Sequence, residues 1–521
     1  MIILNDIKSI LESSNLNSKY EINNEFYSCN ILFFNPDGKV FNLSKNTVKN
    51  LNINDNVFEP YTKCSLSFID DENSFERLKN ENNNLEFDDN DSLVEGFTFR
   101  GDGRDFVYIE IIPIKDATIV SQGDKYNNVF GFRNLYSVIK SVDKDTSNGK
   151  LKTIHLMDID EKNLSEKKSF FSTKNLLQTD KPLFLLSNKE REVETGTCML
   201  NLLKDVLGYE DEKFITNIDE TGETPDFEKG LSKIFYTSPA ENTALKDLMY
   251  LYEKNVSNNS NNDFSILKKD LYNGLYSLKS MSGIFKTAYN KSDNTPLENN
   301  IEKLIITGKT NASEQSNQNT LKTPSVISFG EMSDIQTINF FNTDSLINSK
   351  KIVTNVLHSY DFNNKIFKIN KKDSDITNIK NIFKENYVND MKGSDDSPFP
   401  NMVLNETKTT NKSFQHNYSL YGENKNILKG EGINKLLKSS LITNLGAEII
   451  VKGQMFRKTG NFISIDRNNF YVDNTFDDKF LGIYFILNVE HNFIEDTKFE
   501  NKILAVKTYI YKDPKFKEDT I

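Results

Sequence analysis

Histidine is the side chain best suited to moving protons near neutral pH, and the chain contains four: His155, His358, His416 and His491. Catalysis would need one of them beside a carboxylate or a nucleophile, and neither Gly-x-Ser-x-Gly nor His-Glu-x-x-His occurs. His155 lies in a strand-like pattern, His358 ends a predicted helix and His416 lies in a polar segment. His491 lies in LGIYFILNVEHNF (481–493), whose alternation is typical of a strand. We therefore interpret His491 as structural.

The tripeptide Arg100-Gly101-Asp102 matches the motif that integrins recognise, but so short a match is a weak hypothesis. Gly101 and Gly103 also lie where a tight turn between two strands requires glycine. We interpret the motif as a turn. Carboxylates such as Asp102 and Asp105 are so abundant in this acidic chain that their spacing does not indicate an acid–base pair.

Two further motifs each lack a residue that binding would require. Asp88-Asp89-Asn90-Asp91 resembles the start of a calcium loop, but Leu93 stands where such loops need glycine, and no glutamate follows at the right spacing. Gly430-Glu431-Gly432 precedes a predicted helix, but it has neither a preceding strand nor the Gly-Lys-Ser/Thr ending of a phosphate-binding loop. We interpret the first motif as an acidic loop and the second as the entry into a helix.

The three cysteines, Cys29, Cys64 and Cys198, are far apart and odd in number. No Cys-x-x-Cys or Cys/His spacing occurs, so the sequence supports neither a zinc site nor a disulfide framework. We expect the chain to fold in a reducing cytoplasm. The sequence therefore predicts no catalytic residue, no metal ligand and no cofactor.

Composition limits the classes of protein to which the chain could belong. Its 521 residues suggest about two to four domains, and 38 Phe and 21 Tyr supply large apolar surfaces for their cores. The formal net charge is −11. Since Lys and Arg on phosphates provide most nucleic-acid affinity, stable nucleic-acid binding is not expected. The stretch MIILNDIKSILESSN is too short and too interrupted for a signal peptide or a membrane span, and no run of about 18 apolar residues occurs.

The first 180 residues are predicted to form mostly strands. ILFFNPDGKVFNL (31–43) has two apolar arms around a turn signal, and GFTFRGDGRDFVYIEIIPI (96–114) repeats this pattern. Residues 129–142 and 150–159 form a third predicted pair, joined by DKDTSNG. Three hairpins with polar turns predict an antiparallel sheet or barrel.

Helical patterns follow in the middle of the chain. Residues 195–209 have apolar residues at helical spacing, and Gly208 suits the C-terminal end. Residues 238–255 are predicted to form a helix that begins with Ser238 as N-cap, Pro239 at the first position and Glu241 in a capping box.

Residues 263–281 are predicted to form a hairpin around Asn273-Gly274, and the polar residues 286–325 a linker. The last third is predicted to contain further strands, two helices and one polar insertion. The strands are 325–341, 358–372, 447–454, 460–466, 484–494 and 500–512. The helices are 343–357 and 432–448 (stopped by Gly446), and the insertion is 373–426.

The order of these pieces resembles the central baseplate hub protein of contractile-tailed bacteriophages, a family related to the hub part of type VI secretion spike proteins. The passages that carry the resemblance are VKNLNINDNVFEPYTKCSLSFIDDENSFERL (48–78), DSLVEGFTFRGDGRDFVYIEIIPI (91–114), NVFGFRNLYSVIKSVDKDTSNGKLKTIHLMDIDEKNLSEKKSFFSTK (128–174), YTSPAENTALKDLMYLYEKN (236–255), DFSILKKDLYNGLYSLKSM (263–281), IIVKGQMFRKTGNFISI (449–465) and LGIYFILNVEHNFIEDTKFENKILAVKTYIYK (481–512). The segments 286–325 and 373–426 look like insertions into that pattern, and Asp473 to Lys479 form an acidic loop where the family has a tight turn.

The resemblance implies an α+β fold dominated by β structure, with two tube-like antiparallel β-barrel domains and helical insertions. It places the first barrel in 1–180, a mixed helix-and-hairpin domain in 181–325 and the second barrel in 326–521. It also implies a non-enzymatic homotrimer in the virion tail baseplate, assembled in the host cytoplasm. Such a hub joins the tail tube protein to the central spike protein, contacts other baseplate proteins, and meets DNA only in transit through a lumen that we expect to be acidic.

Three alternatives remain open at the level of sequence. Another tail component, such as a wedge or tube adaptor, would have the same composition. A glycan-acting enzyme would need two carboxylates about 5–10 Å apart, and the absence of Trp removes one common platform for sugar stacking. A bacterial surface adhesin would usually carry a signal peptide.

Overall fold

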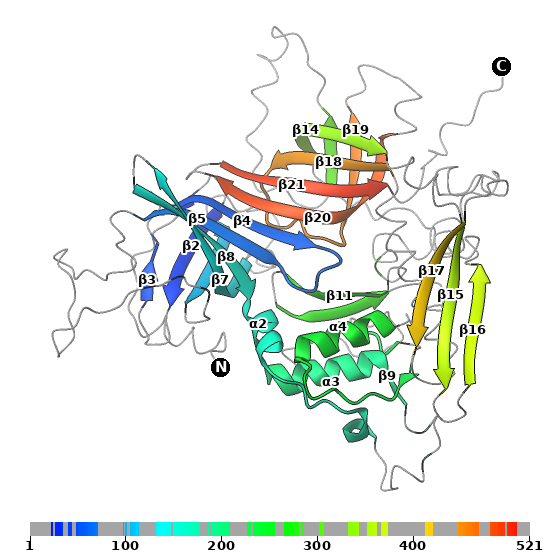
Figure 1. Cartoon of the computed structure of the whole chain (residues 1–521). Coiled ribbons are helices and arrows are strands. Elements are labelled where there is room, and N and C mark those ends of the chain that lie inside the picture. The colour runs from blue at the N-terminus through cyan, green and yellow to red at the C-terminus, as the bar shows by residue number, and fades with distance from the viewer. Residues whose placement is uncertain are drawn as a thin grey trace, which may run out of the picture.

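The computed structural model of the chain is dominated by β structure (Figure 1). The residues it describes are 22–23, 27–34, 40–43, 48–70, 97, 99, 101, 105–113, 132–146, 149–177, 186, 190, 192–208, 227–230, 233–255, 265–271, 274–280, 284, 302–306, 332–342, 352–361, 366–373, 412–419, 445–467, 480–494 and 498–507. Most of the strands belong to one 14-stranded, mainly antiparallel sheet that combines both ends of the sequence. No helix within the described ranges is long and apolar enough to cross a membrane.

The N-terminal part of this sheet is antiparallel throughout, in the order β1-β2-β6-β7-β8-β5-β4, with β3 paired to β2. The strands are β1 (Ile22–Asn23), β2 (Tyr27–Phe34), β3 (Val40–Asn42), β4 (Val48–Asn56), β5 (Lys63–Asp70), β6 (Phe106–Pro113), β7 (Phe132–Thr146) and β8 (Gly149–Asp158). The pairing of β2 with β3 confirms the hairpin predicted at 31–43. The pairing of β7 with β8 confirms the third pair, although its turn is tighter than predicted, since Thr146 and Gly149 are already partners.

The hairpin predicted at 96–114 is wrong. β6 forms as its second arm, but β2 and β7 pair with the two edges of β6, which leaves no edge for the predicted first arm. Phe97 and Phe99 lie instead in the core, both with 0% of their surface exposed. The alternation of phenylalanines therefore reflected burial in a connecting segment.

The C-terminal part of the sheet forms a cycle of pairings. Its strands are β13 (Glu302–Ile306), β14 (Met332–Asn342), β18 (Leu445–Lys452), β19 (Phe462–Arg467), β20 (Gly482–Ile494) and β21 (Lys498–Lys507). β20 pairs with β19, β19 with β13, β13 with β14, β14 with β18, β18 with β21, and β21 again with β20. The four final strands predicted from the sequence and the strand before residue 342 are thus present.

Two predictions in this part are wrong. β13 lies within the predicted linker 286–325, because its short apolar run is held between β14 and β19. The helix predicted at 432–448 cannot extend through Gly446, because β18 begins at Leu445; residues 432–444 lie outside the described ranges. A Cβ at residue 446 would lie 2.1 Å from the Phe341 ring, so glycine here allows close packing and does not stop a helix.

A separate three-stranded sheet has the order β16-β15-β17. Its strands are β15 (Ile352–Asp361), β16 (Ile366–Asp373) and β17 (Lys412–Ser419). The helix predicted at 343–357 is therefore wrong from Ile352 onward, where the β-branched residues of IVTNV favour a strand. β17 likewise lies in the predicted polar insertion 373–426. The stretch predicted as a strand at 358–372 is divided between β15 and β16, which pair antiparallel.

The middle of the chain forms a small unit of helices and short strands. Its elements are α2 (Ile159–Glu166), the 3-10 helix η4 (Thr173–Leu176), β9 (Val193–Glu194), α3 (Thr195–Leu207), β10 (Lys233–Ile234), α4 (Ala244–Lys254), β11 (Ser265–Lys269) and β12 (Tyr276–Ser280). The helix predicted at 195–209 is confirmed, and Gly208 ends it in the left-handed conformation at φ 70°. The hairpin predicted at 263–281 is confirmed by the β11–β12 pairing, with Gly274 at φ 68°.

The predicted start of α4 is wrong. Thr243 is the N-cap, and its side chain accepts a hydrogen bond from the Lys246 main chain. The main chain of Ser238 donates instead to Phe171, at 2.9 Å. Residues 237 and 243 form β-bridges with 172 and 168, and between them Asn242 donates to the Pro239 carbonyl in a turn, so the helix begins only after Thr243.

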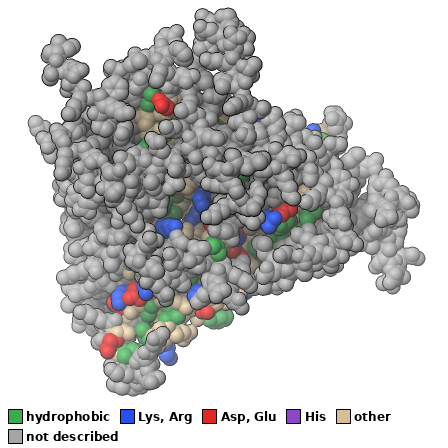
Figure 2. All heavy atoms as spheres, turned by 180° about the vertical axis from the view of Figure 1, so that it is seen from behind, with side chains coloured by type: hydrophobic (Ala, Val, Ile, Leu, Met, Phe, Trp, Pro, Cys, Tyr) green, Lys and Arg blue, Asp and Glu red, His purple; other side chains and the backbone are tan. Residues whose placement is uncertain are grey.

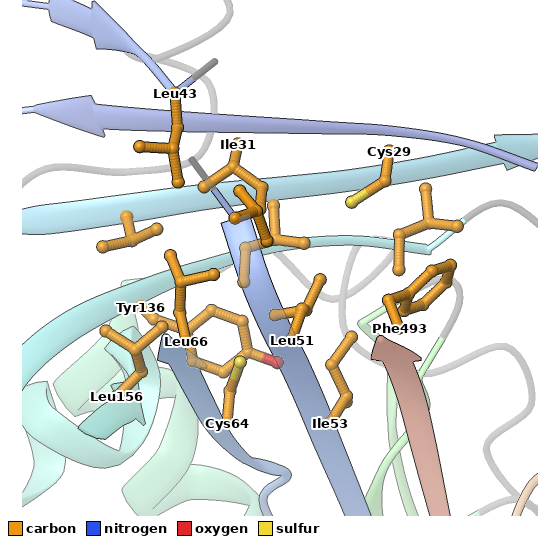
Figure 3. Close-up of a cluster of buried hydrophobic side chains, with 14 of the residues drawn as sticks. Cys29, Ile31, Leu43, Leu51, Ile53, Cys64, Leu66, Tyr136, Leu156 and Phe493 are labelled. Carbon is orange, nitrogen blue, oxygen red and sulfur yellow. The ribbon is translucent and has the colours of Figure 1, made fainter. Parts of the chain in front are cut away.

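The first sheet curls around one hydrophobic core (Figure 3). The rings of Phe33 in β2 and Phe68 in β5 lie 5.6 Å apart, although β6, β7 and β8 separate these strands in the sheet. The cycle of six strands surrounds a second core, to which every one of its strands contributes. That core consists of Leu304, Ile335, Ala447, Ile449, Val451, Ile463, Ile465, Tyr484, Ile486, Val489, Ile503 and Ala505.

A third core lies between α2, α3, α4 and the β11–β12 hairpin. This unit also covers part of the first sheet from outside. Ile159 of α2 packs against outward-facing residues of β2, β6 and β7, and the Lys162 ammonium lies 4.7 Å from the centre of the Phe106 ring. Figure 2 shows hydrophobic side chains reaching the surface in the lower part of the molecule, where Figure 1 places this unit.

Candidate functional site: the seam between the first and last segments

The first and last segments of the chain meet where β4 pairs with β20, and we call these two strands the seam. They are antiparallel, and their pairing runs from Asn56 beside Asn488 to Asn50 beside Ile494. β5 continues the sheet on one side, and β19 and β21 continue it on the other. The seam therefore joins the curled first sheet to the cycle of six strands (Figure 1).

On the inner side of the seam, polar residues interrupt an apolar alternation. Leu51 and Ile53 of β4 face inward, and Asp55 occupies the next inward position with 1% exposure. His491 lies between the inward-facing Val489 and Phe493 of β20 and has no exposed surface. Because a buried polar group without a partner is costly, each of these residues must be satisfied by neighbouring elements.

Asp55 is held by two distant elements. Its Oδ2 accepts hydrogen bonds from the main-chain nitrogen and the hydroxyl of Thr459, at 2.9 and 2.8 Å. Its Oδ1 pairs with Lys268 of β11, which also donates to the carbonyls of Asn56 and Glu59 at 2.7 and 3.0 Å. Burial would raise the pKa of Asp55, but Lys268 and Thr459 outweigh it and lower the pKa below its ordinary value. Asp55 is therefore a charged residue that links β4 to β11 and to Thr459.

The β11–β12 hairpin also forms ion pairs with β8 and α2. Lys269 lies 2.9 Å from Asp158 Oδ1 and 2.7 Å from Asp160 Oδ2, and Tyr276 donates to the same Asp160 oxygen at 3.0 Å. Lys458 pairs with Asp270 at 2.6 Å. A cavity of about 280 Å³ lies among these elements. Three of the lysines that line it, at 268, 269 and 458, have carboxylate partners, and the arrangement joins three parts of the chain.

His491 belongs to a buried polar cluster. Its Nδ1 accepts a hydrogen bond from the Asn501 amide at 2.9 Å, and Asn501 Oδ1 accepts from the Gln454 main chain at 2.7 Å and from Arg457 at 2.6 Å. Burial, aided by Arg457 and opposed by Asp55, lowers the pKa of His491 to about 4. The imidazole is consequently neutral at physiological pH and serves as a hydrogen-bond acceptor inside the protein.

The same cluster reaches β2 and closes the first sheet against the last segment. Tyr27 donates to Gln454 Oε1 at 2.9 Å and accepts from the Met455 main chain at 3.1 Å. Its ring meets Phe499 edge to face, with 5.5 Å between centroids, and Phe499 stacks on Phe493 at 4.0 Å. β2 and β4, which are separated in the sheet, are therefore both tied to the loop 453–461.

The outer side of the seam is polar and mostly uncharged. The register places Ser65, Asn52 and Asn492 side by side across β5, β4 and β20, and the amide of Asn52 donates to Asn492 Oδ1. Ser67 pairs with Thr153 of β8 at 2.9 Å. The outer side is thus a row of hydroxyls and amides that continues from the first segment into the last.

The structure places the other sequence candidates away from the seam or outside the described ranges. His155 is exposed on β8, while His358 and His416 lie in β15 and β17, not at a helix end or in a polar loop. Asp88 to Asp91 and Gly430 to Gly432 lie outside the described ranges.

Gly101 and Asp105 have structural roles. Gly101 has φ 75°, and a Cβ there would lie 2.2 Å from the Ile139 carbonyl oxygen, so glycine allows this close approach; Arg100 and Asp102 are not described, and the turn stays a prediction. Asp105 is 3% exposed, and its Oδ2 accepts a hydrogen bond from the main-chain nitrogen of Phe99 at 2.6 Å.

The three cysteines are free and buried. Burial raises the pKa of the Cys198 thiol to about 12, and burial also holds the pKa values of Cys29 and Cys64 above their usual range. Cys29 and Cys64 belong to the first core (Figure 3). Within the described ranges, no group of three or more His, Cys, Asp or Glu side chains could hold a metal ion.

Sequence reasoning missed the residues that fasten the seam, above all Asp55, Arg457 and Asn501. One signal could have found two of them. In LNINDN, Asp55 is in phase with the apolar Leu51 and Ile53, and in FENKI, Asn501 is in phase with Phe499 and Ile503. A polar residue at an inward position of a strand predicts a buried partner.

No protein-family model matches the chain. No curated protein matches it.

Solved structures give similarities along most of the chain. The tail protein from Neisseria meningitidis MC58 has a TM-score of 0.43 and 8% identity, covering 92% of this chain and 98% of that one. The 43 kDa tail protein of prophage MuSo2 from Shewanella oneidensis has a TM-score of 0.43 and 10% identity, covering 92% and 99%. The Francisella PdpA–VgrG complex has a TM-score of 0.42 and 11% identity, covering 98% of this chain and 64% of that one. The structural neighbours of the chain are thus phage tail and type VI secretion proteins, at low TM-score and low identity.

Proposed function

We propose that the chain is a structural protein of a contractile phage tail and that it forms the trimeric central hub of the baseplate. In this role three copies surround a channel, join the tail tube to the central spike, and contact other baseplate proteins. DNA passes through the channel without being held. The proposal assigns the protein to the virion tail and gives it no catalytic role.

The observation that carries the proposal is the arrangement of strands around the seam. The cycle from β20 through β19, β13, β14, β18 and β21 has no free edge and one shared core, as a small barrel requires. The first sheet curls around its own core and is tied to the loop 453–461 through Tyr27. Two barrel-like halves per chain, joined by pairing, are the arrangement from which three copies can present six similar lobes.

The passages that resemble the hub family support the same proposal. Residues 48–70 form β4 and β5, residues 132–158 form β7 and β8, and residues 482–507 form β20 and β21. These three passages lie next to one another in the sheet, although they come from both ends of the sequence. The family resemblance was based on the order of elements, and this adjacency gives that order a common structural basis.

The domain division at 1–180, 181–325 and 326–521 belongs to this proposal. The cores give it physical content, because the first core draws mainly on the first division, the third core on the helical unit and the second core on the last division. Several residues cross these boundaries: Leu271, Met455, Phe493 and Phe499 join the first core, Tyr61, Leu164 and Phe171 join the third, and Leu304 joins the second.

Light scattering on the purified full chain tests the proposal. A mass near three times 59.9 kDa is expected. A monomer or an even-numbered oligomer at the highest soluble concentration, unchanged when the chain is co-expressed with its spike partner, would contradict the trimeric hub. It would favour another tail component, such as a wedge or tube adaptor.

A further inference from the structure

The outer side of the seam is rich in amide and hydroxyl side chains. The outward-facing hydroxyls and amides of β5, β4 and β20 form a surface that we call the amide face, made of Ser65, Ser67, Asn50, Asn52, Asn54, Asn56, Asn488 and Asn492. The charged residues of these three strands that are not buried are Lys49, Lys63 and Glu490.

We infer that the amide face lines the channel of the assembled hub, where it contacts the passing nucleic acid without retaining it. This inference rests on the proposed trimeric hub and names the surface that meets the polyanion.

The lysines at 63, 498 and 502, on and beside the amide face, each lie close to a carboxylate. Lys63 pairs with Glu59 at 2.6 Å, and on the neighbouring strand β21 Lys498 pairs with Glu500 and Lys502 with Glu448, each at 2.6 Å. Phosphate affinity depends on cations that can exchange their counterions for phosphates. The centre of this face offers neutral hydrogen-bonding groups, so it would hydrate a duplex but not hold it. The low phosphate affinity expected of an acidic lumen is here provided by uncharged groups.

The amide face is unsuited to a dry contact between proteins. Burying amides and hydroxyls without new partners is costly, and the cores of protein interfaces are apolar and aromatic. The residues suited to such contacts lie elsewhere, since Phe170 is 86% exposed and Val142 is 46% exposed. The amide face is therefore expected to remain wet after assembly.

The outward face of the first sheet is divided in a way that agrees with this reading. Its apolar part, on β2, β6 and β7, is packed against Ile159 of α2. Its polar part, on β8, β5 and β4, continues through the seam into β20 and β21, so it is shared by both halves of the chain. Three copies would present this shared surface three times around the axis, as part of the wall of a ring.

Cysteine labelling tests the inference, because the three native thiols are buried and have raised pKa values. Asn52→Cys is prepared in the full chain and its oligomeric mass is measured. The thiol is labelled with biotin-maleimide, and streptavidin is added before and after denaturation. Val142→Cys serves as the matched control on another strand of the same sheet, and Asn492→Cys replaces Asn52→Cys if the latter does not fold.

The expected result is a trimer in which Asn52→Cys reacts fully with the small reagent but binds streptavidin only after denaturation, because streptavidin is wider than a channel sized for a duplex. Streptavidin binding to the native trimer would place the amide face on the outside and overturn the inference. Failure of biotin-maleimide to react would place it in a subunit contact and also overturn it. Both outcomes leave the trimer intact, whereas a monomer would contradict the proposed hub itself.

Discussion

At the scale of single residues, buried polar side chains link different parts of the chain. They lie at strand positions where the alternation predicts apolar residues. Asp55 and His491 both face inward; Asp55 is bound by Thr459, 404 positions away in the sequence, and His491 accepts a hydrogen bond from Asn501 of the neighbouring strand β21. Their role follows from burial, because an unpaired polar group in a core opposes folding. Substitutions at these positions should therefore affect stability and assembly together.

The buried His491 predicts a specific pH dependence of stability. Its pKa in the folded protein is about 4, below the ordinary value of 6.5, so the unfolded chain binds the proton more readily. The neutral histidine thus contributes fully above pH 6.5, and this contribution is lost as the pH falls towards 4, by roughly 3 kcal/mol in total. We expect the urea midpoint, followed by tyrosine fluorescence, to fall over this window.

His491→Gln should flatten that part of the pH profile, while the exposed His155→Gln should leave it unchanged. If both variants retained the profile of the natural chain between pH 6.5 and 4, other groups would be responsible and His491 would not be the titrating residue.

Removing one partner of the Asp55–Lys268 pair should be costly. Asp55→Ala leaves Lys268 buried beside the seam without its carboxylate, which we expect to destabilise the protein by about 3–5 kcal/mol. The double variant Asp55→Ala, Lys268→Met should recover part of this loss. Lys63→Met removes a largely exposed ion pair and should cost less than about 1 kcal/mol. Equal urea midpoints for Asp55→Ala and Lys63→Met would show that the buried pair does not fasten the seam.

At the scale of elements, the loop 453–461 holds the two halves in place by close packing. A Cβ at residue 453 would lie 2.2 Å from the Phe499 ring, and Phe499 is held between Phe493 and Tyr27. We expect Gly453→Ala to cost about 1–3 kcal/mol by overpacking, measured by thermal unfolding. Phe499→Leu in the same chain should recover part of the loss.

Gly208→Ala provides the comparison, because a Cβ there meets open space and only the φ of 70° opposes it. Its cost should be about 1 kcal/mol. A Gly453→Ala variant no less stable than Gly208→Ala would mean that the loop yields easily and does not position the halves.

The elements also show what could be predicted from the sequence. β4, β5 and β20 could be predicted because each has a clear alternation, and α3 because it has both an apolar stripe and Gly208. The start of α4 could not, since Ser238 and Thr243 both suit an N-cap and bridges to residues 168–172 decide between them. β13 could not either, because its five residues form a strand only between β14 and β19.

The candidate site was predictable in part, because inward-facing polar residues can be recognised from the alternation of a strand. Alternation within a strand shows that Asp55, His491 and Asn501 face inward, and therefore that partners exist. It cannot identify those partners, because Thr459 lies 404 positions from Asp55 and Lys268 lies 212 positions from Asn56. Only the folded topology brings the hairpin and the loop to the seam.

At the scale of the whole molecule, the seam makes one continuous sheet from the two ends of the chain. The helical unit is fastened to this sheet through Lys268 and Lys269 of one hairpin, so the three cores cannot move independently without breaking buried ion pairs. A rigid subunit of this kind suits a closed ring, in which small errors of angle would prevent closure.

The most direct test of this account is electron microscopy of the full chain, viewed along the axis of its assembly. The account predicts a three-fold ring with six similar lobes around an open channel, because in the proposed hub each chain contributes the curled first sheet and the cycle of six strands, joined at the seam. Particles that lack three-fold symmetry, or a trimer whose centre is filled by protein, would contradict it.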